Sequence, residues 1–100
     1  MNYHKFKAIQ TEVDGIKFQS KKEARYYSEL KLRMLAGEVI FFLRQTPFHL
    51  TGNVTYRVDF TEFHSDGTIH FVDVKGLQTP MFKLKKKQVE ALYPIKIEIR

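Results

Sequence analysis

Two aspartates and a lysine near the middle of the chain have the types and spacing of a metal-dependent hydrolytic site. Asp59 and Asp73 each lie in a run rich in β-branched and aromatic residues, which is typical of a strand, and Lys75 follows Asp73 by two positions. If the strands pair so that the carboxylates face each other, their Cβ atoms lie roughly 5 Å apart. Opposed like charges are destabilising unless a cation lies between them. Because Lys75 projects from the same strand face as Asp73, the three groups would surround one point.

The loop between the two runs decides whether those carboxylates meet. A three-residue hairpin loop, Ser65–Gly67, with its glycine in the left-handed conformation, pairs Asp59 with Asp73. A two-residue turn at Asp66–Gly67 would instead pair Asp59 with Val74 and turn Asp73 to the opposite face. Local turn chemistry allows both. A third interpretation is a solvated hairpin whose aspartates discourage aggregation, although large apolar neighbours favour strands covered on both sides.

Length and composition limit the class of protein. One hundred residues, 43% of them apolar and nine of them phenylalanine, predict one folded domain. No apolar run approaches the roughly 20 residues of a membrane span, and Met1–Gln10 is too charged for a signal peptide. The lack of cysteine excludes disulfides, thiolate zinc sites and cysteine nucleophiles, and it fits a cytoplasmic protein. A Gly-rich phosphate loop and a G-x-S-x-G motif are also missing from the sequence.

The net charge of +6 is unevenly distributed. Residues 1–36 carry +4, residues 37–74 carry −3 and residues 75–100 carry +5. An acidic centre between basic flanks suits a polyanion held around a site that needs a cation. Basic surfaces also serve solubility or bind anionic lipid, so charge alone favours nucleic acid without requiring it.

Turn signals and hydrophobic periodicity predict a mixed α/β domain with helices packed on a sheet. Ser20 is the expected N-cap of the first helix and Gly37 its stop, and Pro94 ends the second helix. The predicted elements are a hairpin over 7–18 turning at Asp14-Gly15, a helix over 21–36, strands over 39–43 and 48–50 interrupted near Gln45–Pro47, strands over 54–64 and 68–75, a helix over 81–93 and a strand over 95–100.

The first predicted helix carries a further candidate ligand. Glu23 begins an apolar stripe that continues through Tyr27, Leu30 and Met34 and would meet the sheet. Ser20-x-x-Glu23 is also a capping box, in which the glutamate only bonds back to the N-cap amide. A metal role remains open beside it, because two carboxylates are a small ligand set for magnesium. The opposite, solvated face holds Lys22, Arg25, Glu29 and Arg33.

The second predicted helix places polar residues inside its apolar stripe. That stripe comprises Met81, Leu84, Val89, Ala91 and Leu92, with Lys85 and Gln88 near its middle and with Lys83, Lys86, Lys87 and Glu90 pointing away. Lys85 either extends past the core edge into water or reaches the carboxylates or a bound phosphate. The second role predicts that Lys85 matters more for turnover than its neighbour Lys86. The histidines, His4, His49, His64 and His70, lack ligand-like spacing and are expected to be surface or core polar residues.

Val58-Asp59, followed on the next strand by Asp73-Val74-Lys75, resembles the split signature of the PD-(D/E)xK nuclease superfamily, which has the restriction-endonuclease-like fold. The flanking helices fit that fold's αβββαβ core over residues 20–100, with residues 1–19 as an added N-terminal hairpin. Val58 replaces the usual proline, which is not a ligand. More narrowly, a longer ordered set is similar to a family of small phage-encoded proteins with this nuclease core: Asp14-Gly-Ile-Lys-Phe-x-Ser20-x-x-Glu23, Gln45-x-Pro47, Asp59-Phe60 and Asp73-Val-Lys-Gly76.

The resemblance implies a role for each matched residue. Asp59 and Asp73 would ligate Mg²⁺ or Mn²⁺ together with the backbone carbonyl of Val74, and Glu23 would complete the set directly or through water. Lys75 would hold and polarise the attacking water. The residues expected to support these groups or to contact DNA are Gln45, Lys85, Gln88, Arg57, Lys83, Lys86 and Lys87.

The function implied by the resemblance is that of a magnesium-dependent DNA endonuclease. Selectivity for branched DNA such as a four-way junction is expected, because a chain of 100 residues has little room for a sequence-reading domain. Junction resolution needs paired active sites and therefore a homodimer, acting in phage DNA recombination in the bacterial host's cytoplasm. The alternative is a non-catalytic nucleic-acid-binding protein that uses basic flanks and exposed aromatics such as Tyr26 and Tyr56. A pure binder, however, would gain nothing from acidic groups that face phosphate.

Overall fold

The elements follow the predicted order of hairpin, helix, strands, helix and strand, with three strands between the two helices. The computed structural model describes residues 10–100, so positions 7–9 of the predicted first hairpin, and His4, lie outside the described residues. Within that range, no helix is both long and apolar enough to cross a membrane. The elements are β1 (Thr11–Val13), β2 (Ile16–Phe18), α1 (Lys21–Leu35), β3 (Val39–Leu50), β4 (Val54–His64), β5 (Ile69–Asp73), α2 (Pro80–Leu92) and β6 (Ile97–Ile99).

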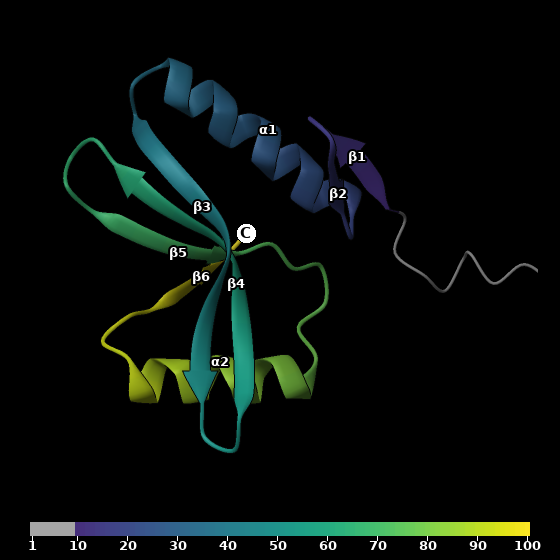
Figure 1. Cartoon of the computed structure of the whole chain (residues 1–100), viewed down its shortest axis with the longest axis vertical. Helices are drawn as coiled ribbons and strands as arrows, with labels where there is room; N and C mark the ends of the chain where they lie inside the picture. The colour runs from purple at the N-terminus through teal and green to yellow at the C-terminus, as the bar shows by residue number, and fades with distance from the viewer. Residues whose placement is uncertain (1–9) are drawn as a thin grey trace, which may run out of the picture.

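The main sheet is mixed and has the strand order β3-β4-β5-β6. Neighbouring strands are antiparallel except β5 and β6, which are parallel and are joined through α2. The β1–β2 hairpin forms a separate two-stranded sheet beside the first turns of α1 (Figure 1). The two helices pack near opposite ends of the long β3–β4 pair, and the C-terminus lies between them in the view of Figure 1.

The β4–β5 hairpin has the three-residue loop. The backbone N–H of His64 donates to the carbonyl of Thr68 at 2.9 Å, and Gly67 adopts the left-handed conformation with φ +89°. The ladder continues in the same register to Phe60 opposite Val72, so the next positions along the two strands are those of the two aspartates. The two-residue alternative is therefore wrong.

One long strand, β3, replaces the two short strands predicted before the hairpin. At the predicted interruption the strand is locally irregular. Gln45 has φ +56° and forms no ladder pair, whereas Arg44 and Thr46 on either side of it do. The residue opposite Gln45 in this register is Asp59. The strand is thus continuous but distorted at the position facing the first aspartate.

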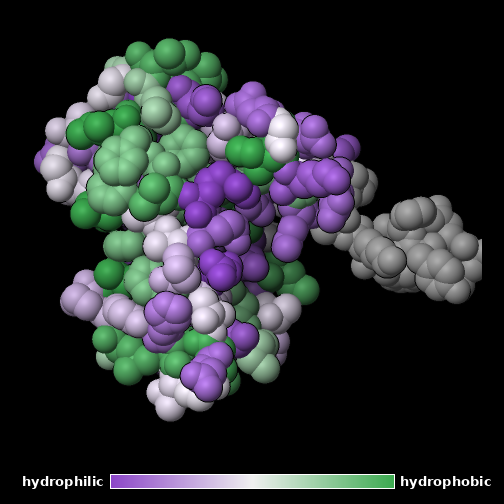
Figure 2. Space-filling view, in the orientation of Figure 1, coloured by the Kyte–Doolittle hydropathy of each residue, from purple (hydrophilic) through white to green (hydrophobic). Residues whose placement is uncertain are grey.

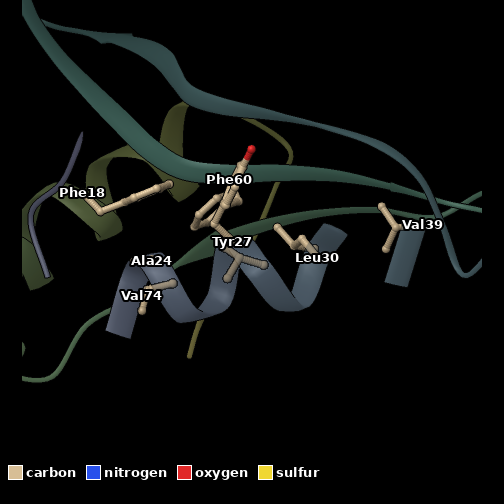
Figure 3. Close-up of a cluster of buried hydrophobic side chains, with 8 residues drawn as sticks. Phe18, Ala24, Tyr27, Leu30, Val39, Phe60 and Val74 are labelled. Atoms are coloured by element: carbon tan, nitrogen blue, oxygen red, sulfur yellow. The ribbon is translucent and has the colours of Figure 1, made fainter. Parts of the chain in front are cut away.

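Two hydrophobic clusters divide the core between the helices. In the first, Ala24, Tyr27 and Leu30 of α1 lie against Phe60 of the sheet, as Figure 3 shows. The second lies under α2 and contains Leu50, Val58, Val89 and Ile97. Residues two apart share a face in a regular strand, yet Val58 and Phe60 belong to different clusters. β4 therefore changes its partner helix at Asp59, which places this residue at the boundary between the two clusters.

The buried face of α2 differs from the predicted stripe. Phe82 and Val89 are the buried side chains of this helix. Of the predicted stripe, Ala91 is exposed, and Met81, Leu84 and Leu92 are each more than half exposed. The difference follows from the sheet, because Phe82 packs near Tyr56 and Val89 joins Leu50, Val58 and Ile97, so these contacts turn the helix away from its longer apolar stripe.

Lys86 and Glu90 do not point away from the protein as predicted. The Lys86 Nζ donates to Glu90 Oε2 at 3.0 Å, and the same carboxylate oxygen accepts the backbone N–H of Ile97 at 2.8 Å. Both side chains are largely buried, with 26% and 15% exposed. The pair links α2 to the start of β6, so Lys86 has a structural partner and is not a solvated residue.

We expect Lys86→Met to destabilise the fold by about 1 kcal/mol, because Glu90 would lose a charged hydrogen-bond donor at a partly buried position. Urea unfolding measures the change. Lys87→Met is the matched control, since Lys87 is exposed one residue further along, and its unfolding free energy should stay within about 0.5 kcal/mol of the wild type. Equal values for the two variants would contradict a structural role for the Lys86–Glu90 pair.

Candidate active site

Asp59 and Asp73 are cross-strand neighbours, as predicted. The backbone N–H of Asp59 donates to Asp73 Oδ1 at 2.9 Å, and the backbone N–H of Val74 donates to Asp59 Oδ2 at 2.9 Å. Each carboxylate thus bonds to the backbone of the opposite strand at the point where the regular ladder ends. These two bonds hold the carboxylates side by side.

Neutral donors occupy the remaining carboxylate oxygens. The Tyr56 hydroxyl donates to Asp73 Oδ2, and Gln45 Nε2 donates to Asp59 Oδ1 at 3.3 Å, in agreement with the supporting position predicted for Gln45. Burial and the bond to Asp73 raise the pKa of the Tyr56 phenol, so this group stays a donor at neutral pH. Asp73 is only 1% exposed, and burial raises the pKa of its carboxyl against the opposing effect of its hydrogen bonds.

Lys75 lies beside the same carboxylates. Its Nζ is 5.0 Å from the centre of the Phe82 ring, and its positive charge lowers the pKa of both Glu23 and Asp73. Its backbone is paired with the C-terminal residue, because the Lys75 N–H donates to the Arg100 carbonyl at 3.1 Å. The lysine is thus held through its backbone by Arg100, directly after β6, and through its side chain by Phe82 of α2.

Glu23 approaches the aspartates from the first turn of α1. Ser20 caps the helix by accepting the Glu23 N–H at 3.1 Å, but the reciprocal side-chain bond of a capping box is missing from the part of the chain that the structure describes. The Glu23 carboxylate is buried and lies 3.9 Å from Arg44 Nη2. Burial, assisted by the charge of Asp59, raises the pKa of Glu23 to about 7.

The donor set suits a hard divalent cation although it does not form a closed metal cage. Among residues 10–100, no three His, Cys, Asp or Glu side chains are close enough together to hold an ion in this arrangement. Asp59, Asp73 and Glu23 nevertheless offer only oxygen donors, which Mg²⁺ and Mn²⁺ prefer. The negative charge of Asp59 raises the pKa of both other carboxyls, so additional positive charge would be favourable here.

The raised pKa of Glu23 predicts a pH-dependent stability. A glutamate titrates near 4.5 in the unfolded chain but near 7 in the folded protein, so the folded state binds more protons between these values. The contribution of Glu23 to stability is therefore greatest below pH 4.5 and is lost as the pH rises through 7. Since one pKa unit is about 1.4 kcal/mol, the contribution lost between pH 5 and pH 8 is on the order of 2 kcal/mol.

Urea unfolding in EDTA at pH 5 and pH 8 measures this contribution. Glu23→Gln should lose less stability than the wild type across this range, because glutamine does not ionise. Glu29→Gln on the exposed face of the same helix is the control and should follow the wild type. The same pH dependence in wild type and Glu23→Gln would show that Glu23 does not titrate in this range.

Several predicted supporting residues lie elsewhere. Gln88 is exposed beside Leu50 and Thr51 at the far end of β3, so of its two predicted roles only contact with DNA fits its position. Lys85 is half-buried, and no bond from it to the carboxylates is present within residues 10–100. The predicted DNA-contacting residues Arg57, Lys83 and Lys87 are exposed, and the two lysines lie with Lys86 beside β6.

Two aromatic residues that were expected to be exposed are instead packed against the rest of the protein. Tyr26 and Tyr56 are both half-buried, and their hydroxyls donate to Glu62 and Asp73. The expectation of exposed stacking platforms is therefore wrong. Tyr56 and Phe82 are residues at the site that sequence reasoning missed, because no local pattern places them beside Asp73 and Lys75. The pairing of β4 with β5 brings Tyr56 to Asp73, and the packing of α2 on the sheet brings Phe82 to Lys75.

The described histidines are polar residues of the fold, as predicted. His64 bonds to Glu62 at 2.8 Å, and His70 bonds to Glu98 at 2.6 Å. The two rings lie 4.1 Å apart, so they form one polar network on the sheet surface. On the sheet register this network begins beyond Phe60 and Val72, away from the two aspartates.

Comparison with known proteins identifies the family of this chain. No curated protein and no solved structure matches it. A family model described as "Protein of unknown function (DUF1064)" matches residues 3–99, which is nearly the whole chain. The protein therefore belongs to the DUF1064 family.

Proposed function

We propose that this protein is a DNA endonuclease that depends on Mg²⁺ or Mn²⁺ and has a PD-(D/E)xK core. The reciprocal bonds that place the Asp59 and Asp73 carboxylates together, with Lys75 beside them, carry this proposal. The order of helix, three strands, helix and strand supports it, as does Glu23 on the first helix. Both features agree with the resemblance of the sequence to PD-(D/E)xK nucleases.

Each residue has a defined task in this proposal. Asp59, Asp73 and the Val74 carbonyl would hold the metal with help from Glu23, and the metal would supply the Lewis acidity that activates water and neutralises charge on the phosphate. Lys75 positions the water and adds a positive group where negative charge develops. The donors on the carboxylates, Tyr56 and Gln45 among them, fix the orientation of the ligands.

Basic surface beside the site supports a polyanionic substrate. A hollow of about 310 Å³ borders Val74 and is lined by Lys22, Arg25, Tyr26, Glu29 and Arg100 as well. The Lys22 Nζ donates to the Lys75 carbonyl at 3.0 Å, so this cation directly adjoins the site. Figure 2 shows strongly hydrophilic residues gathered in the centre of the molecule, around the position of the C-terminus in Figure 1. The cations Lys22, Arg25 and Arg100 beside the site favour contact with phosphates.

Branched DNA is the substrate class that we propose. The residues of the domain are largely taken up by one sheet, two helices and a hairpin, which leaves little surface for reading bases. Contacts with phosphates position a protein on DNA without reading its bases, so they can serve recognition of DNA shape. Cutting two strands of a junction symmetrically needs two sites, so we propose a homodimer acting in the cytoplasm of a bacterial host.

Cleavage assays test the proposed function. Labelled four-way junction, nicked duplex and linear duplex of the same sequence are incubated with Mg²⁺, with Mn²⁺ and with EDTA. We expect metal-dependent cleavage that is fastest on the junction and is lost in EDTA. Tight binding of all three DNAs with no cleavage in either metal would favour the alternative, a non-catalytic nucleic-acid-binding protein.

A further inference from the structure

A second hollow, on the side of Asp59 away from Val74, joins the N-terminal hairpin to the candidate active site. It measures about 260 Å³ and is lined by Lys17, Gln19, Glu23, Arg44, Gln45 and Asp59. Since one water occupies about 30 Å³, it has room for a phosphate group and several waters. Its two cations, Lys17 and Arg44, come from β2 and β3.

Arg44 is held in place but its hydrogen-bonding capacity is not used. Its guanidinium carbon lies 4.6 Å from the centre of the Phe18 ring, and Phe18 is fully buried, so the aromatic ring supports the guanidinium. The Arg44 Nε is buried and meets no acceptor within residues 10–100. The 3.9 Å from Nη2 to Glu23 Oε2 is too long for a hydrogen bond. A buried donor without an acceptor is costly. The Arg44 side chain as a whole is 25% exposed and lines the hollow, so a ligand bound there can reach the guanidinium.

The hairpin fixes the second cation relative to the first. Its turn at Asp14-Gly15 has φ angles of +53° and +76°, which are those of the tight two-residue turn predicted there. The Tyr27 hydroxyl of α1 donates to the Asp14 carboxylate at 2.9 Å, so the hairpin is attached to the helix. Lys17 precedes the buried Phe18 and therefore projects to the opposite, open side of β2.

We propose that Arg44 and Lys17 form a phosphate subsite that holds the DNA backbone next to the cleaved bond. This inference rests on the proposed function and gives the N-terminal hairpin a part in substrate binding. The planar guanidinium can donate two parallel hydrogen bonds to a phosphodiester, and the ammonium adds a point charge. A phosphate oxygen takes the place that Glu23 Oε2 occupies opposite Arg44 in the free protein. The subsite explains why Arg44 carries unused donors directly beside Gln45 and Asp59.

Binding of phosphate-scanned DNA tests this subsite. A DNA series in which single phosphates are replaced by neutral methylphosphonate is titrated in EDTA against wild type, Arg44→Met, Arg44→Lys and Lys83→Met. We expect Arg44→Met to bind unmodified DNA roughly tenfold more weakly and to lower the salt slope by about one. One methylphosphonate position should weaken wild-type binding but leave Arg44→Met unaffected. Lys83→Met, on the exposed surface, should stay sensitive at that position.

A second measurement separates this proposal from the proposed function. The Nε–H of Arg44 is followed by NMR while inorganic phosphate is added to the metal-free protein, with a thermal melt on each variant to confirm folding. A saturable shift that Lys17→Met weakens supports the subsite even if no DNA is cleaved. An unmoved signal overturns it, whatever the cleavage assays show.

Arg44 could also act only as the counter-ion of Glu23, and the Glu23→Gln background distinguishes this role. If Arg44 contacts phosphate, Arg44→Met still weakens DNA binding when residue 23 is glutamine. Loss of that effect in the double variant overturns the subsite and leaves Arg44 as a partner of Glu23. Should Arg44→Met fail to fold, Arg44→Lys provides the same comparison, since it keeps the charge and removes the paired donors.

Discussion

Asp73→Asn should reduce cleavage at least a hundredfold, which is the order of loss when one group that stabilises transition-state charge is removed. The substitution takes away a ligand charge at the most buried of the three carboxylates. DNA affinity in EDTA should stay equal or rise, because a negative group that repels phosphate is gone. Single-turnover cleavage and equilibrium binding measure the two effects separately.

Asp73→Asn should not weaken the fold. Burial raises the pKa of Asp73, so the folded state already favours a neutral group at this position. Asparagine retains an oxygen that can accept the Asp59 N–H, and loss of the opposed charge should stabilise the metal-free protein by about 0.5 kcal/mol. Asp66→Asn, in the exposed β4–β5 loop, removes the same charge and should leave cleavage unchanged. Normal cleavage by Asp73→Asn would disprove the assigned chemistry.

Lys75→Met should lower turnover by roughly a hundredfold while changing DNA affinity little, because the ammonium acts where charge develops and not along the DNA path. Methionine keeps a side chain that can pack against Phe82. The removal of this charge should also raise the pKa of Glu23 further, since the ammonium now lowers it. A pH profile of stability in EDTA therefore reports on Lys75 independently of activity.

Lys85→Met and Lys87→Met test whether a second lysine acts with Lys75 at the reacting groups. Lys87 is exposed, so its loss should remove at most one phosphate contact and change the salt slope by about one. Lys85 is half-buried, and a fall in turnover at unchanged stability would place it with Lys75 at the reacting groups. Unchanged turnover would assign Lys85 to the protein surface. If Lys75→Met turned over as fast as Lys87→Met, the role proposed for Lys75 would be wrong.

Local chemistry explains the parts of the structure that the sequence predicted well. The Ser65–Gly67 loop places its glycine at φ +89°, and this turn alone determines the register that brings Asp59 and Asp73 together. The cap at Ser20 and the left-handed Gly37 bound α1 as predicted. Each of these features depends on residues only a few positions apart, so the sequence contains the whole cause.

Long-range packing decided the features that the sequence did not show. The buried face of α2 follows from the sheet residues available to it, so Phe82 and Val89 are covered while a longer apolar stripe stays exposed. Likewise, the partners of Glu23 and Asp73 come from other elements, namely Arg44 and Tyr56. The sequence by itself therefore determined which groups could do chemistry and how the hairpin aligns two of them. The tertiary structure alone decided their burial, their hydrogen-bond donors and the cations beside them, because these depend on contacts between distant segments.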